Sequence, residues 1–366
     1  MRVGLVIYGT LDPVSGGYLY DRKLVEHLEG RGDDVIVFQQ PKRSYPLRPV
    51  ENANISFWRR LASADLDVLL QDELNHGSLA FGNYWLRHRI DAPIVAIVHH
   101  LRAQERPFGL PAVGSRFLEW LYLRATDARI YNSPATKQSV EALAGARPHV
   151  VARPSGCRFG AAASAEEIYR RATSEGPLRL LFVGNLIPRK RPDLLIEGLS
   201  RVEATPWRLD LVGNLSADPS YVAALRERVR RLDDPSRVTL HGRVPDEELK
   251  RRLAASHVLA VPSVHEGYGI VYVEAMGRGL PVLAGRSGGV RDVVRHGETG
   301  RFVDTADDVA RAVDAWGENR ERLAELGEAA AAHYRSTPTW TETCRRMASF
   351  LDRIVDDTAH APTPVS

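Results

Sequence analysis

Short apolar runs alternate with longer stretches of helical periodicity along almost the whole chain of 366 residues. In the first half these runs are almost entirely apolar, as in "VGLVIYG" and "PIVAIVHH". Such runs are typical of strands that are buried on both faces of a parallel sheet. Helical stretches between them favour repeated strand–helix–strand units. The strands expected in this half are 3–9, 34–38, 67–72, 93–100 and 128–133.

The alternation pauses in the middle of the chain and then restarts. Residues 158–177, "RFGAAASAEEIYRRATSEGP", are polar, rich in alanine and without a strand pattern, which predicts a connection between domains. The length of the chain suits two domains of ordinary size. The strands expected in the second half are 178–185, 207–214, 237–242, 257–263, 280–285 and 300–304.

Two rounds of alternation predict an α/β protein with two facing Rossmann-like domains, each built on a doubly wound parallel sheet. We expect the domains at 1–165 and 166–337. Residues 338–366 are expected to form an amphipathic helix over 339–357 and a disordered tail, "TAHAPTPVS". Ligands of such sheets bind outside the carboxyl ends of the strands, so we expect the site in the cleft between the domains.

Composition narrows the class of protein. With 44% hydrophobic and 26% charged residues, the chain has the composition of a soluble globular protein, and a net charge of +3 does not indicate nucleic acid binding. The two cysteines, Cys157 and Cys344, lack a metal-binding or C-x-x-C spacing, which fits a reducing cytosol. No apolar run approaches the roughly 18 residues of a membrane-spanning helix. The start, "MRVGLVIYG", predicts a first strand rather than a signal peptide, so we expect a cytoplasmic protein.

Glycine-containing loops follow two of the expected strands. Ser15, Gly16 and Gly17 stand between the first strand and a helix, where amides can approach an anion or simply turn the chain. The same alternatives hold for "AGRSGGVRDVV" (284–294). No G-x-G-x-x-G follows a strand and no G-x-x-x-x-G-K-[ST] is present, which argues against an NAD-dependent oxidoreductase and an ATP-hydrolysing enzyme.

Two cations, Arg189 and Lys190, stand between a strand and a helix in "FVGNLIPRKRPDLLIEGL". Cations at the carboxyl end of a strand suit a diphosphate. At an effective dielectric near 20, a charge pair at ~4 Å is worth about 4 kcal/mol before desolvation. If this attraction grows as a leaving diphosphate gathers charge, it lowers the barrier. The alternative is a solvated basic turn.

Two glutamates lie eight positions apart in "VHEGYGIVYVEAMGRGLPVLA". Glu266 is expected in the loop after a strand, and Glu274 inside the following helix. A carboxylate accepts hydrogen bonds from sugar hydroxyls, so two separated carboxylates can hold two sugar rings. The amides of Tyr268, Gly269 and Ile270 would cap the helix start and could face a phosphate. The alternative is a capping glutamate and an unrelated glutamate on the helix surface.

The segments "GNLIPRKRPDLLIEGL", "LDLVGN" and "VTLHGRVPDEELKRRLAASHVLAVPSVHEGYGIVYVEAMGRGLPVLAGRSGGVRDVVRHGETGRFV" strongly resemble family 4 retaining glycosyltransferases of the GT-B fold. Their E-x7-E signature matches Glu266 and Glu274. The resemblance covers the second half, and reaches the first half more loosely through Gly16, Gly17 and the histidines His99 and His100. It implies a nucleotide-sugar donor on the C-terminal domain, an acceptor largely on the N-terminal domain, a C-terminal helix that crosses back, and no metal or other cofactor.

The resemblance also implies roles for individual residues. Glu266 is expected to contact the donor sugar, Glu274 the ribose, and Lys190 with Arg189 the diphosphate. His99 is expected near the reacting carbon, where it could orient the acceptor or stabilise positive charge through its backbone carbonyl, with a purely structural role as the alternative. Glu266, His99 and Lys190 are therefore the predicted catalytic residues. The other predicted donor-binding residues are Gly16, Gly17, Asn185, Gly213, His241, Gly242, Arg243, Gly267, Tyr268, Gly269 and Ile270.

One departure from the family pattern concerns the diphosphate. The family usually has G-R where this chain has Gly184 and Asn185, and K-G where it has Lys190 and Arg191. A diphosphate-binding arginine is therefore missing. Either Arg189 or Arg191 is expected to supply the charge instead.

The expected reaction is the metal-independent transfer of a hexose-type sugar from a nucleoside diphosphate sugar, UDP being favoured over GDP. The acceptor is an unidentified hydroxyl of a small molecule, a glycan or a lipid. A glutamate that holds the ribose is not placed for a two-carboxylate glycosidase mechanism, so a front-face displacement is expected. A GT-B nucleotide-sugar epimerase and a non-catalytic nucleotide-sugar-binding protein are the alternatives.

The first half contains a basic stretch with aromatics, 41–61, and an apolar helix candidate, 114–127. Family members that glycosylate lipids often carry such surfaces. A peripheral contact with the inner face of the membrane is therefore one interpretation, and a solvated loop with an internal helix is the other.

Overall fold

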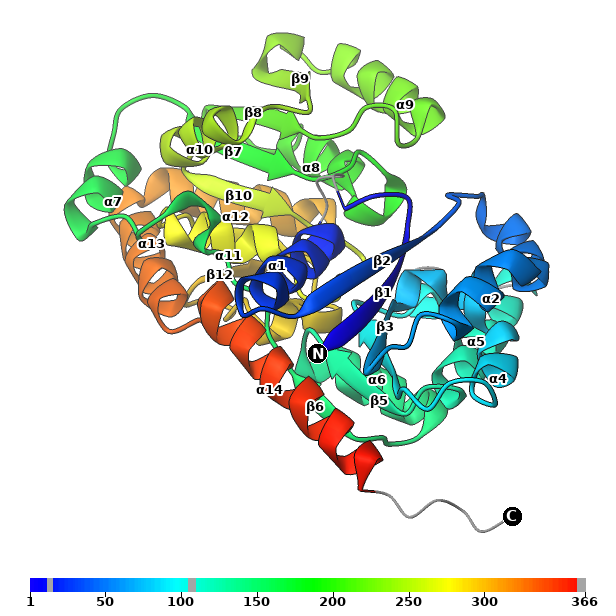
Figure 1. Ribbon diagram of the computed structural model, residues 1–366. Coiled ribbons are helices and arrows are strands. Elements are labelled where there is room, and N and C mark those ends of the chain that lie inside the picture. The colour runs from blue at the N-terminus through cyan, green and yellow to red at the C-terminus, as the bar shows by residue number, and fades with distance from the viewer. Residues whose placement is uncertain (12–15, 105–109, 361–366) are drawn as a thin grey trace. The chain divides into compact units, whose positions relative to one another are not determined.

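The computed structural model describes residues 1–11, 16–104 and 110–360. The chain divides into two compact units, and each is described by itself. The first unit comprises Met1–Pro154 together with Pro338–Ser366, and the second unit comprises Ser155–Thr337. Each unit contains a six-stranded sheet in which all pairings are parallel, which confirms the expected α/β class (Figure 1).

The first sheet has the strand order β2-β1-β3-β4-β5-β6. Its central strands are buried along their whole length, because uninterrupted apolar side chains cover both faces. The sequence did not reveal β6, which has only three residues. The strands are β1 Arg2–Tyr8, β2 Asp34–Gln40, β3 Val68–Asp72, β4 Ile94–Val98, β5 Ala128–Tyr131 and β6 His149–Val151.

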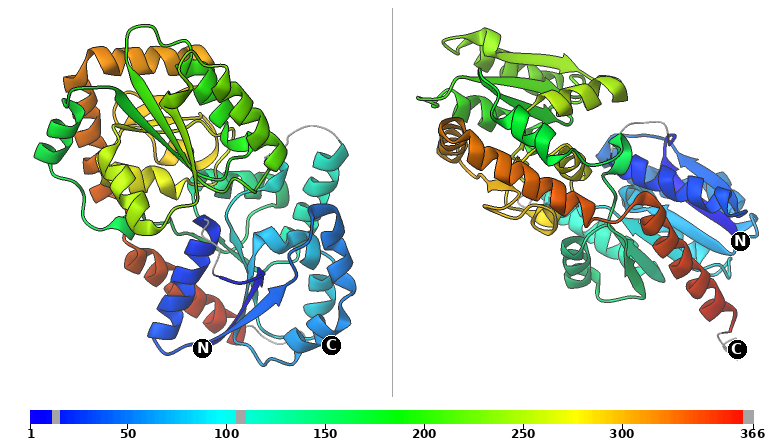
Figure 2. Two further views of the ribbon diagram at one scale, coloured as in Figure 1. Left: turned by 90° about the horizontal axis from the view of Figure 1, so that it is seen from above. Right: turned by 90° about the vertical axis from the view of Figure 1, so that its left-hand side faces the viewer.

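The helices of the first unit include the segment that returns from the end of the chain. Helix α14 begins with a capping box, in which Thr339 and Glu342 satisfy each other's backbone amides, and it packs along α1 (Figures 1 and 2). Of the tail expected to be disordered, Thr358 and Ala359 belong to α14, and 361–366 lie outside the described residues. The helices are α1 Gly16–Gly30, α2 Ile55–Ala62, α3 His76–Leu79, α4 Gly82–Leu86, α5 Leu110–Arg124, α6 Pro134–Ala144 and α14 Trp340–Ala359.

The second sheet has the strand order β12-β11-β10-β7-β8-β9, and all six of its strands coincide with expected ones. One large apolar core fills the space between this sheet and its helices. The strands are β7 Leu178–Val183, β8 Trp207–Val212, β9 Val238–Gly242, β10 Val258–Val261, β11 Val282–Ala284 and β12 Gly300–Phe302. The helices are α7 Ala165–Ala172, α8 Pro192–Leu199, α9 Pro219–Arg230, α10 Asp246–Ala255, α11 Ile270–Gly277, α12 Ala306–Glu318 and α13 Arg320–Arg335.

The segment 158–177, expected to connect the domains, is instead part of the second unit. Its Ser164 and Glu167 form a capping box that begins α7, and Ile168 on the buried side of α7 packs with Ala163 and Ala331. The second unit therefore begins at Ser155, before the expected boundary at 165/166.

Both sheets contain one point where the direction of strand addition reverses. In the first sheet β1 stands between β2 and β3, and in the second β7 stands between β8 and β10. Loops that follow the two strands at such a point diverge and leave a crevice at the carboxyl ends, where α/β proteins bind ligands. Among the described residues, no helix has both the length and the apolar character needed to cross a bilayer.

Candidate active site

Two loops meet at the reversal point of the second sheet. Loop 184–191 follows β7, loop 262–269 follows β10, and the amide of Val264 donates to the carbonyl of Arg189 over 2.8 Å. The cations predicted to hold a diphosphate and the glutamate predicted to hold the sugar therefore stand on neighbouring loops at one sheet edge.

The turn that presents the cations has an uncommon backbone. Residues Pro188–Lys190 form one 3₁₀ turn, and Arg191 then adopts a left-handed conformation with φ of 52° before Pro192 begins α8. The guanidinium of Arg191 donates to the carbonyl of Asp304 over 3.1 Å. Of the two arginines that could replace the missing one, Arg191 donates to the backbone just before α12, whereas Arg189 donates to the carbonyl of His265 in the glutamate loop.

Glu266 lies between these cations. Its Oε1 accepts a hydrogen bond from Lys190 Nζ and is 3.5 Å from Arg189 Nη1, while the side chain is almost fully buried. Burial alone would raise the pKa of Glu266. The positive charges of Lys190 and Arg189 outweigh it and lower this pKa to about 2. Glu266 is therefore ionised at any physiological pH.

The start of α11 depends on two close approaches at glycines and on one backbone hydrogen bond. Gly269 precedes α11 with φ of 89°, and a Cβ there would lie 2.3 Å from the ring of Tyr272. A Cβ on Gly289 would lie 1.9 Å from the carbonyl oxygen of Gly267, and the amide of Gly289 donates to the carbonyl of Glu266 over 2.8 Å. The glycine loop 284–294 thus supports the Glu266 loop from behind, a role that the sequence did not reveal.

Glu274 occupies the buried side of α11 and has a partner that the sequence did not reveal. Its Oε1 is 3.6 Å from Nη1 of Arg158, whose guanidinium also forms a two-bonded pair with Asp246 at the start of α10. Burial raises the pKa of Glu274 to about 7 against the lowering effect of Arg158. Arg158 lies in the segment that was interpreted as a connection.

The residues expected to flank the base lie at the ends of β8 and β9. A Cβ on Gly213 would lie 1.7 Å from the carbonyl oxygen of Gly184, so only glycine lets these two strand ends meet. His241 Nε2 is 2.5 Å from Asp210 Oδ1 and 3.0 Å from Arg252 Nη1, which ties this histidine into an ion-pair cluster. The remaining predicted donor residues of this unit include exposed Asn185 and Arg243, half-buried Gly242 and Ile270, and buried Tyr268.

His99 and the glycines of α1 come together at the reversal point of the first sheet. A Cβ on Gly17 would lie 3.3 Å from the ring of His99, and Gly16 begins α1 beside it. His99 Nε2 is 3.3 Å from Asp21 Oδ1 and 3.9 Å from Asp72 Oδ1. Burial would lower the pKa of His99, but the carboxylates raise it to about 9. Ser15 lies outside the described residues, and His100 is half-buried.

Two groups of described side chains have the spacing of metal ligands, both in the first unit. Asp21, Asp72 and His99 form one group, and Glu73, His76 and Glu119 form the other; in each, ligand atoms lie within 4.8 Å of one another and are buried. Oxygen and imidazole ligands of this kind suit Zn²⁺, Mn²⁺ or Fe²⁺. The expectation of a metal-independent reaction stays a prediction.

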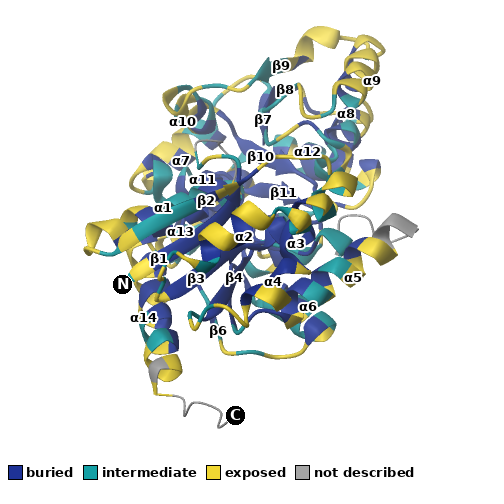
Figure 3. Cartoon of the chain, turned by 45° about the vertical axis from the view of Figure 1, so that its right-hand side comes forward, coloured by how far each residue is buried: buried dark blue, intermediate teal, exposed yellow. Residues whose placement is uncertain are grey.

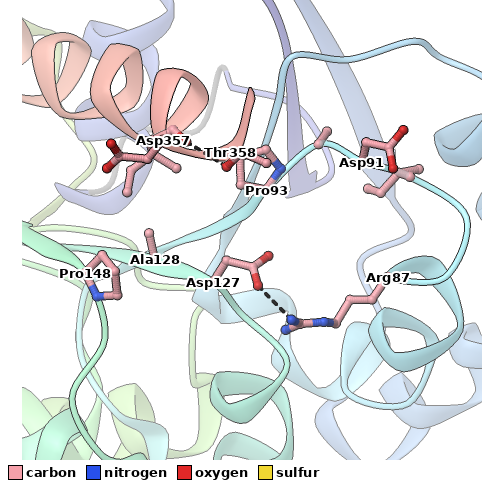
Figure 4. Close-up of a pocket in the computed structure, with 11 residues that line it drawn as sticks. Arg87, Asp91, Pro93, Asp127, Ala128, Pro148, Asp357 and Thr358 are labelled. Atoms are coloured by element: carbon pink, nitrogen blue, oxygen red, sulfur yellow. Dashed lines mark hydrogen bonds and ion pairs between the residues drawn. The ribbon is translucent and has the colours of Figure 1, made fainter. Parts of the chain in front are cut away.

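A pocket of about 370 Å³ lies elsewhere in the first unit, beside the residues that precede β4, β5 and β6 (Figure 4). Its polar lining includes the Arg87–Asp127 ion pair at 2.8 Å and two further aspartates, Asp91 and Asp357. The pocket lies at the amino ends of the strands, whereas the predicted site residues lie at the carboxyl ends. Its acidic lining does not suit a diphosphate.

The two parallel six-stranded sheets have the architecture of the GT-B fold. Sucrose-phosphate synthase from Thermosynechococcus elongatus superposes with a TM-score of 0.82 at 18% identity, over 97% of this chain and 99% of that one. HepE of Anabaena in complex with UDP-glucose gives a TM-score of 0.75 at 20% identity, over 96% and 100%. At these identities the likeness shows the fold alone.

Sequence relatives then give the family. Glycosyl transferases group 1 matches residues 165–333. D-inositol 3-phosphate glycosyltransferases from Kineococcus radiotolerans and Xylanimonas cellulosilytica are 28% and 30% identical, over 78% and 76% of this chain and 76% and 72% of theirs. A GDP-mannose-dependent alpha-(1-6)-phosphatidylinositol monomannoside mannosyltransferase from Mycobacterium tuberculosis is 32% identical over 52% of this chain and 51% of its own. The chain belongs to the group 1 glycosyltransferases, which confirms the expected class of enzyme.

Proposed function

We propose that this glycosyltransferase takes a hexose-type sugar from a nucleoside diphosphate sugar bound to its second unit and transfers it, with retained anomeric configuration, to an acceptor hydroxyl. The observation that carries the proposal is the cluster of Lys190, Arg189 and Glu266 at the reversal point of the second sheet. It places two cations beside an ionised carboxylate, which is the charge pattern that a diphosphate joined to a polyhydroxylated ring requires.

The proposed donor contacts follow from the chemistry of these groups. Lys190 donates to Glu266 and brings a positive charge that can attract a diphosphate oxygen. Arg189 adds a second positive charge. Glu266 accepts hydrogen bonds from hydroxyls of the donor sugar. Glu274, on the second turn of α11, accepts hydrogen bonds from hydroxyls of the ribose.

The proposed reaction is a front-face displacement. The bond from the anomeric carbon to the diphosphate oxygen breaks, the bond to the acceptor oxygen forms on the same face, and the acceptor proton passes to the leaving diphosphate. Glu266 is a poor candidate for a covalent nucleophile, because a carboxylate paired with two cations and with a pKa lowered to about 2 is weakly basic. Lys190 and Arg189 stabilise the charge that develops on the leaving group, without a metal ion.

His99 is proposed to act as a cation on the first unit, where it orients the acceptor or the transferred sugar. The nearby carboxyl groups of Asp21 and Asp72 raise the pKa of its imidazole to about 9, and Asp21 has the stronger effect. Its backbone carbonyl accepts a hydrogen bond from Asn132 Nδ2 over 2.7 Å, and its side chain is almost fully buried.

UDP is the favoured nucleotide, as in the ligands of the HepE complexes, and GDP is the second candidate because one relative is named as GDP-mannose-dependent. A thermal-shift panel of nucleoside diphosphates and nucleotide sugars tests both. A ligand present at 100 times its dissociation constant adds about 2.7 kcal/mol of stability. A clear shift with one nucleotide class supports the proposal, and no shift with any of them refutes it.

The acceptor is proposed to be a hydroxyl of a polyol, a glycan or a lipid, since the relatives are named for inositol phosphate and phosphatidylinositol mannoside acceptors. Product analysis separates this enzyme from its alternatives. A new glycoside formed only with acceptor supports transfer, an isomerised nucleotide sugar formed without acceptor would indicate an epimerase, and donor binding without turnover would indicate a binding protein.

A peripheral membrane contact is proposed for an exposed aromatic and basic face on the first unit, built from α2, α4 and α5 (Figure 3). Tyr84 Oη donates to the carbonyl of Leu121 over 3.3 Å, which joins α4 to α5, and the rings of Phe117 and Trp120 stack at 5.8 Å. Amphipathic aromatics and arginines favour an interface with anionic lipid. The exposed residues of this face are Ile55, Arg59, Arg60, Phe81, Tyr84, Trp85, Arg89, Val113, Arg116, Phe117 and Trp120.

Liposome flotation tests this contact. We expect co-flotation with vesicles that contain anionic lipid, and loss of it when Phe117 and Trp120 are both replaced by serine. Replacing the exposed Tyr169 of the second unit by serine is the matched control. Failure of the wild type to float with anionic vesicles would refute the contact and leave the proposed chemistry intact.

A further inference from the structure

We propose that Arg158, held by Asp246, is a positioning residue that fixes the carboxylate of Glu274 for the hydroxyls of the donor ribose. The inference rests on the proposed function, because it takes Glu274 as the ribose ligand. It adds to that function an ion-paired chain of three residues that makes the site selective for ribonucleotides.

The backbone before Arg158 packs directly on α11, the helix that carries Glu274. A Cβ on Gly156 would lie 2.6 Å from Val273 Cγ1 and 2.8 Å from the amide nitrogen of Glu274, so only glycine permits this approach. The hydroxyl of Ser155 accepts a hydrogen bond from the amide of Cys157 over 3.1 Å and fixes the turn. Arg158 is therefore presented to Glu274 from a rigid backbone.

The guanidinium of Arg158 is held on its far side by Asp246. Arg158 Nε donates to Asp246 Oδ2 over 2.9 Å, and Nη2 donates to Oδ1, which makes a two-bonded pair of fixed orientation. Asp246 is the first residue of α10, where a negative charge is stabilised by the helix dipole. The guanidinium also lies 5.0 Å from the ring centroid of buried Phe159.

The contact with Glu274 differs from an ordinary hydrogen-bonded ion pair. Arg158 Nη1 is 3.6 Å from Glu274 Oε1, which is beyond hydrogen-bond distance. Oε1 is buried and accepts no hydrogen bond from the described residues. Arg158 thus attracts the carboxylate by charge while the lone pairs of Oε1 stay available for a hydroxyl donor, as ribose recognition requires.

The protonation of Glu274 depends on the same contact. The titratable groups that act on it are Arg158, Asp246 and Tyr334 of α13. Burial raises the pKa of Glu274 to about 7, Arg158 opposes that rise, and Asp246 adds to it. Only the ionised carboxylate accepts hydrogen bonds from both ribose hydroxyls, so loss of the Arg158 charge would raise the pKa further and weaken binding most near neutral pH.

Isothermal titration calorimetry can separate this role from a merely structural clamp. The probes are UDP and GDP, their 2′-deoxy and 3′-deoxy counterparts, and inorganic pyrophosphate, which has no ribose. The variants are Arg158→Met, Asp246→Asn and the control Arg201→Met, whose guanidinium pairs with Asp307 and Glu197 on the surface. Thermal unfolding by circular dichroism checks that each variant folds, and Arg158→Lys replaces Arg158→Met if the latter does not.

For Arg158→Met we expect about tenfold weaker binding of the ribonucleotide at pH 7, the size of one lost hydrogen bond to a charged group. The preference for ribose over deoxyribose should shrink, pyrophosphate binding should not change, and ribonucleotide affinity should recover as the pH rises from 7 to 9. Asp246→Asn and Arg158→Lys should act in the same direction more weakly, and Arg201→Met should change nothing.

An unchanged ratio of ribonucleotide to deoxynucleotide affinity in Arg158→Met would overturn the inference while leaving the proposed function in place. Equal losses for ribonucleotide, deoxynucleotide and pyrophosphate would assign Arg158 to a structural clamp and overturn it as well. If the wild-type protein binds none of these nucleotides, the proposed function fails and the inference fails with it.

Discussion

The two sheets reverse direction at one point each, yet the charges at these points are arranged in opposite ways. In the second unit two cations, Arg189 and Lys190, surround one carboxylate, Glu266, and lower its pKa. In the first unit two carboxylates, Asp21 and Asp72, surround one imidazole, His99, and raise its pKa. The sheet therefore fixes where a site forms, whereas the loops that follow the strands fix its charge and its ligand.

Removing the central carboxylate of the second unit should have the largest effect on turnover. Glu266→Gln keeps the shape of the side chain but removes the negative charge beside Lys190 and Arg189 and weakens the proposed contacts with the donor sugar. We expect kcat/KM to fall about 10³-fold, the scale seen when a preorganised group at a reacting centre is lost. Steady-state turnover measures this fall in kcat/KM. The control is Glu325→Gln, which changes an exposed glutamate of α13. Undiminished turnover in Glu266→Gln would contradict the role assigned to Glu266.

Removing one of the two cations tests whether Arg189 replaces the arginine that the family pattern leads us to expect. Arg189→Ala should weaken binding of a nucleoside diphosphate about tenfold to thirtyfold, because an effective charge pair near a diphosphate is lost. Calorimetric titration measures the change. Arg191→Gly removes a cation from the same turn and should leave the affinity unchanged, since its guanidinium is engaged with the carbonyl of Asp304. Equal effects of the two variants would refute the distinction.

In the first unit, Asp21→Asn should change how turnover depends on pH. Asp21 is the strongest of the charges that raise the pKa of His99 to about 9, so His99 is protonated in the wild type below that value. Without this charge the pKa of His99 falls. At a pH above the new pKa, each pH unit by which the pKa has fallen lowers the protonated fraction of His99 about tenfold. We expect turnover to drop about tenfold at pH 8 and to change little at pH 6.

As the pH rises, the activity of Asp21→Asn should therefore begin to fall at a lower pH than the activity of the wild type. Asp356→Asn, at an exposed position of α14, is the matched control for removal of a carboxylate from the same unit. A profile that keeps the wild-type shape would mean that the charge of His99 does not take part.

The smallest expected effect concerns the backbone of the cation turn. Arg191 adopts a left-handed conformation with φ of 52°, which a residue with a Cβ adopts at a cost of roughly 1 kcal/mol. Arg191→Gly should relieve this strain and lose one hydrogen bond, for a net gain in unfolding free energy of about 0.5 kcal/mol. Thermal unfolding measures the shift; a lower melting temperature than that of the wild type would show that the bond to Asp304 outweighs the strain.

Much of the fold was predictable, because strands such as β4 and β10 are apolar on both faces and end at recognisable turns. The sequence of 158–177 predicts a connection between domains because α7 buries only a narrow stripe of residues. The segment is therefore polar in composition, although Ile168 lies in the core. The pattern Ser164-x-x-Glu167 was a capping signal that could have identified this helix.

The location of a candidate residue was predictable where it lies in the loop between a strand and the next helix, as for Lys190 and Glu266. Arg158 was not, because its partners are far away in the chain and only packing brings them together. Asp21 did leave a signal. It shares helical spacing with Leu24, Val25 and Leu28 on the buried face of α1, and a charged residue on such a face requires a partner.

Helix α14 has a consequence for how the protein is made. It completes the first unit, where Trp340 meets Tyr20 edge-on and Thr343 bonds to the carbonyl of Arg153, but the ribosome synthesises it only after the entire second unit. One flank of α1 in the nascent first unit therefore stays uncovered while about half of the coding sequence is still being translated. A premature stop codon after the second unit would leave that flank exposed permanently, even though both sheets had been made in full.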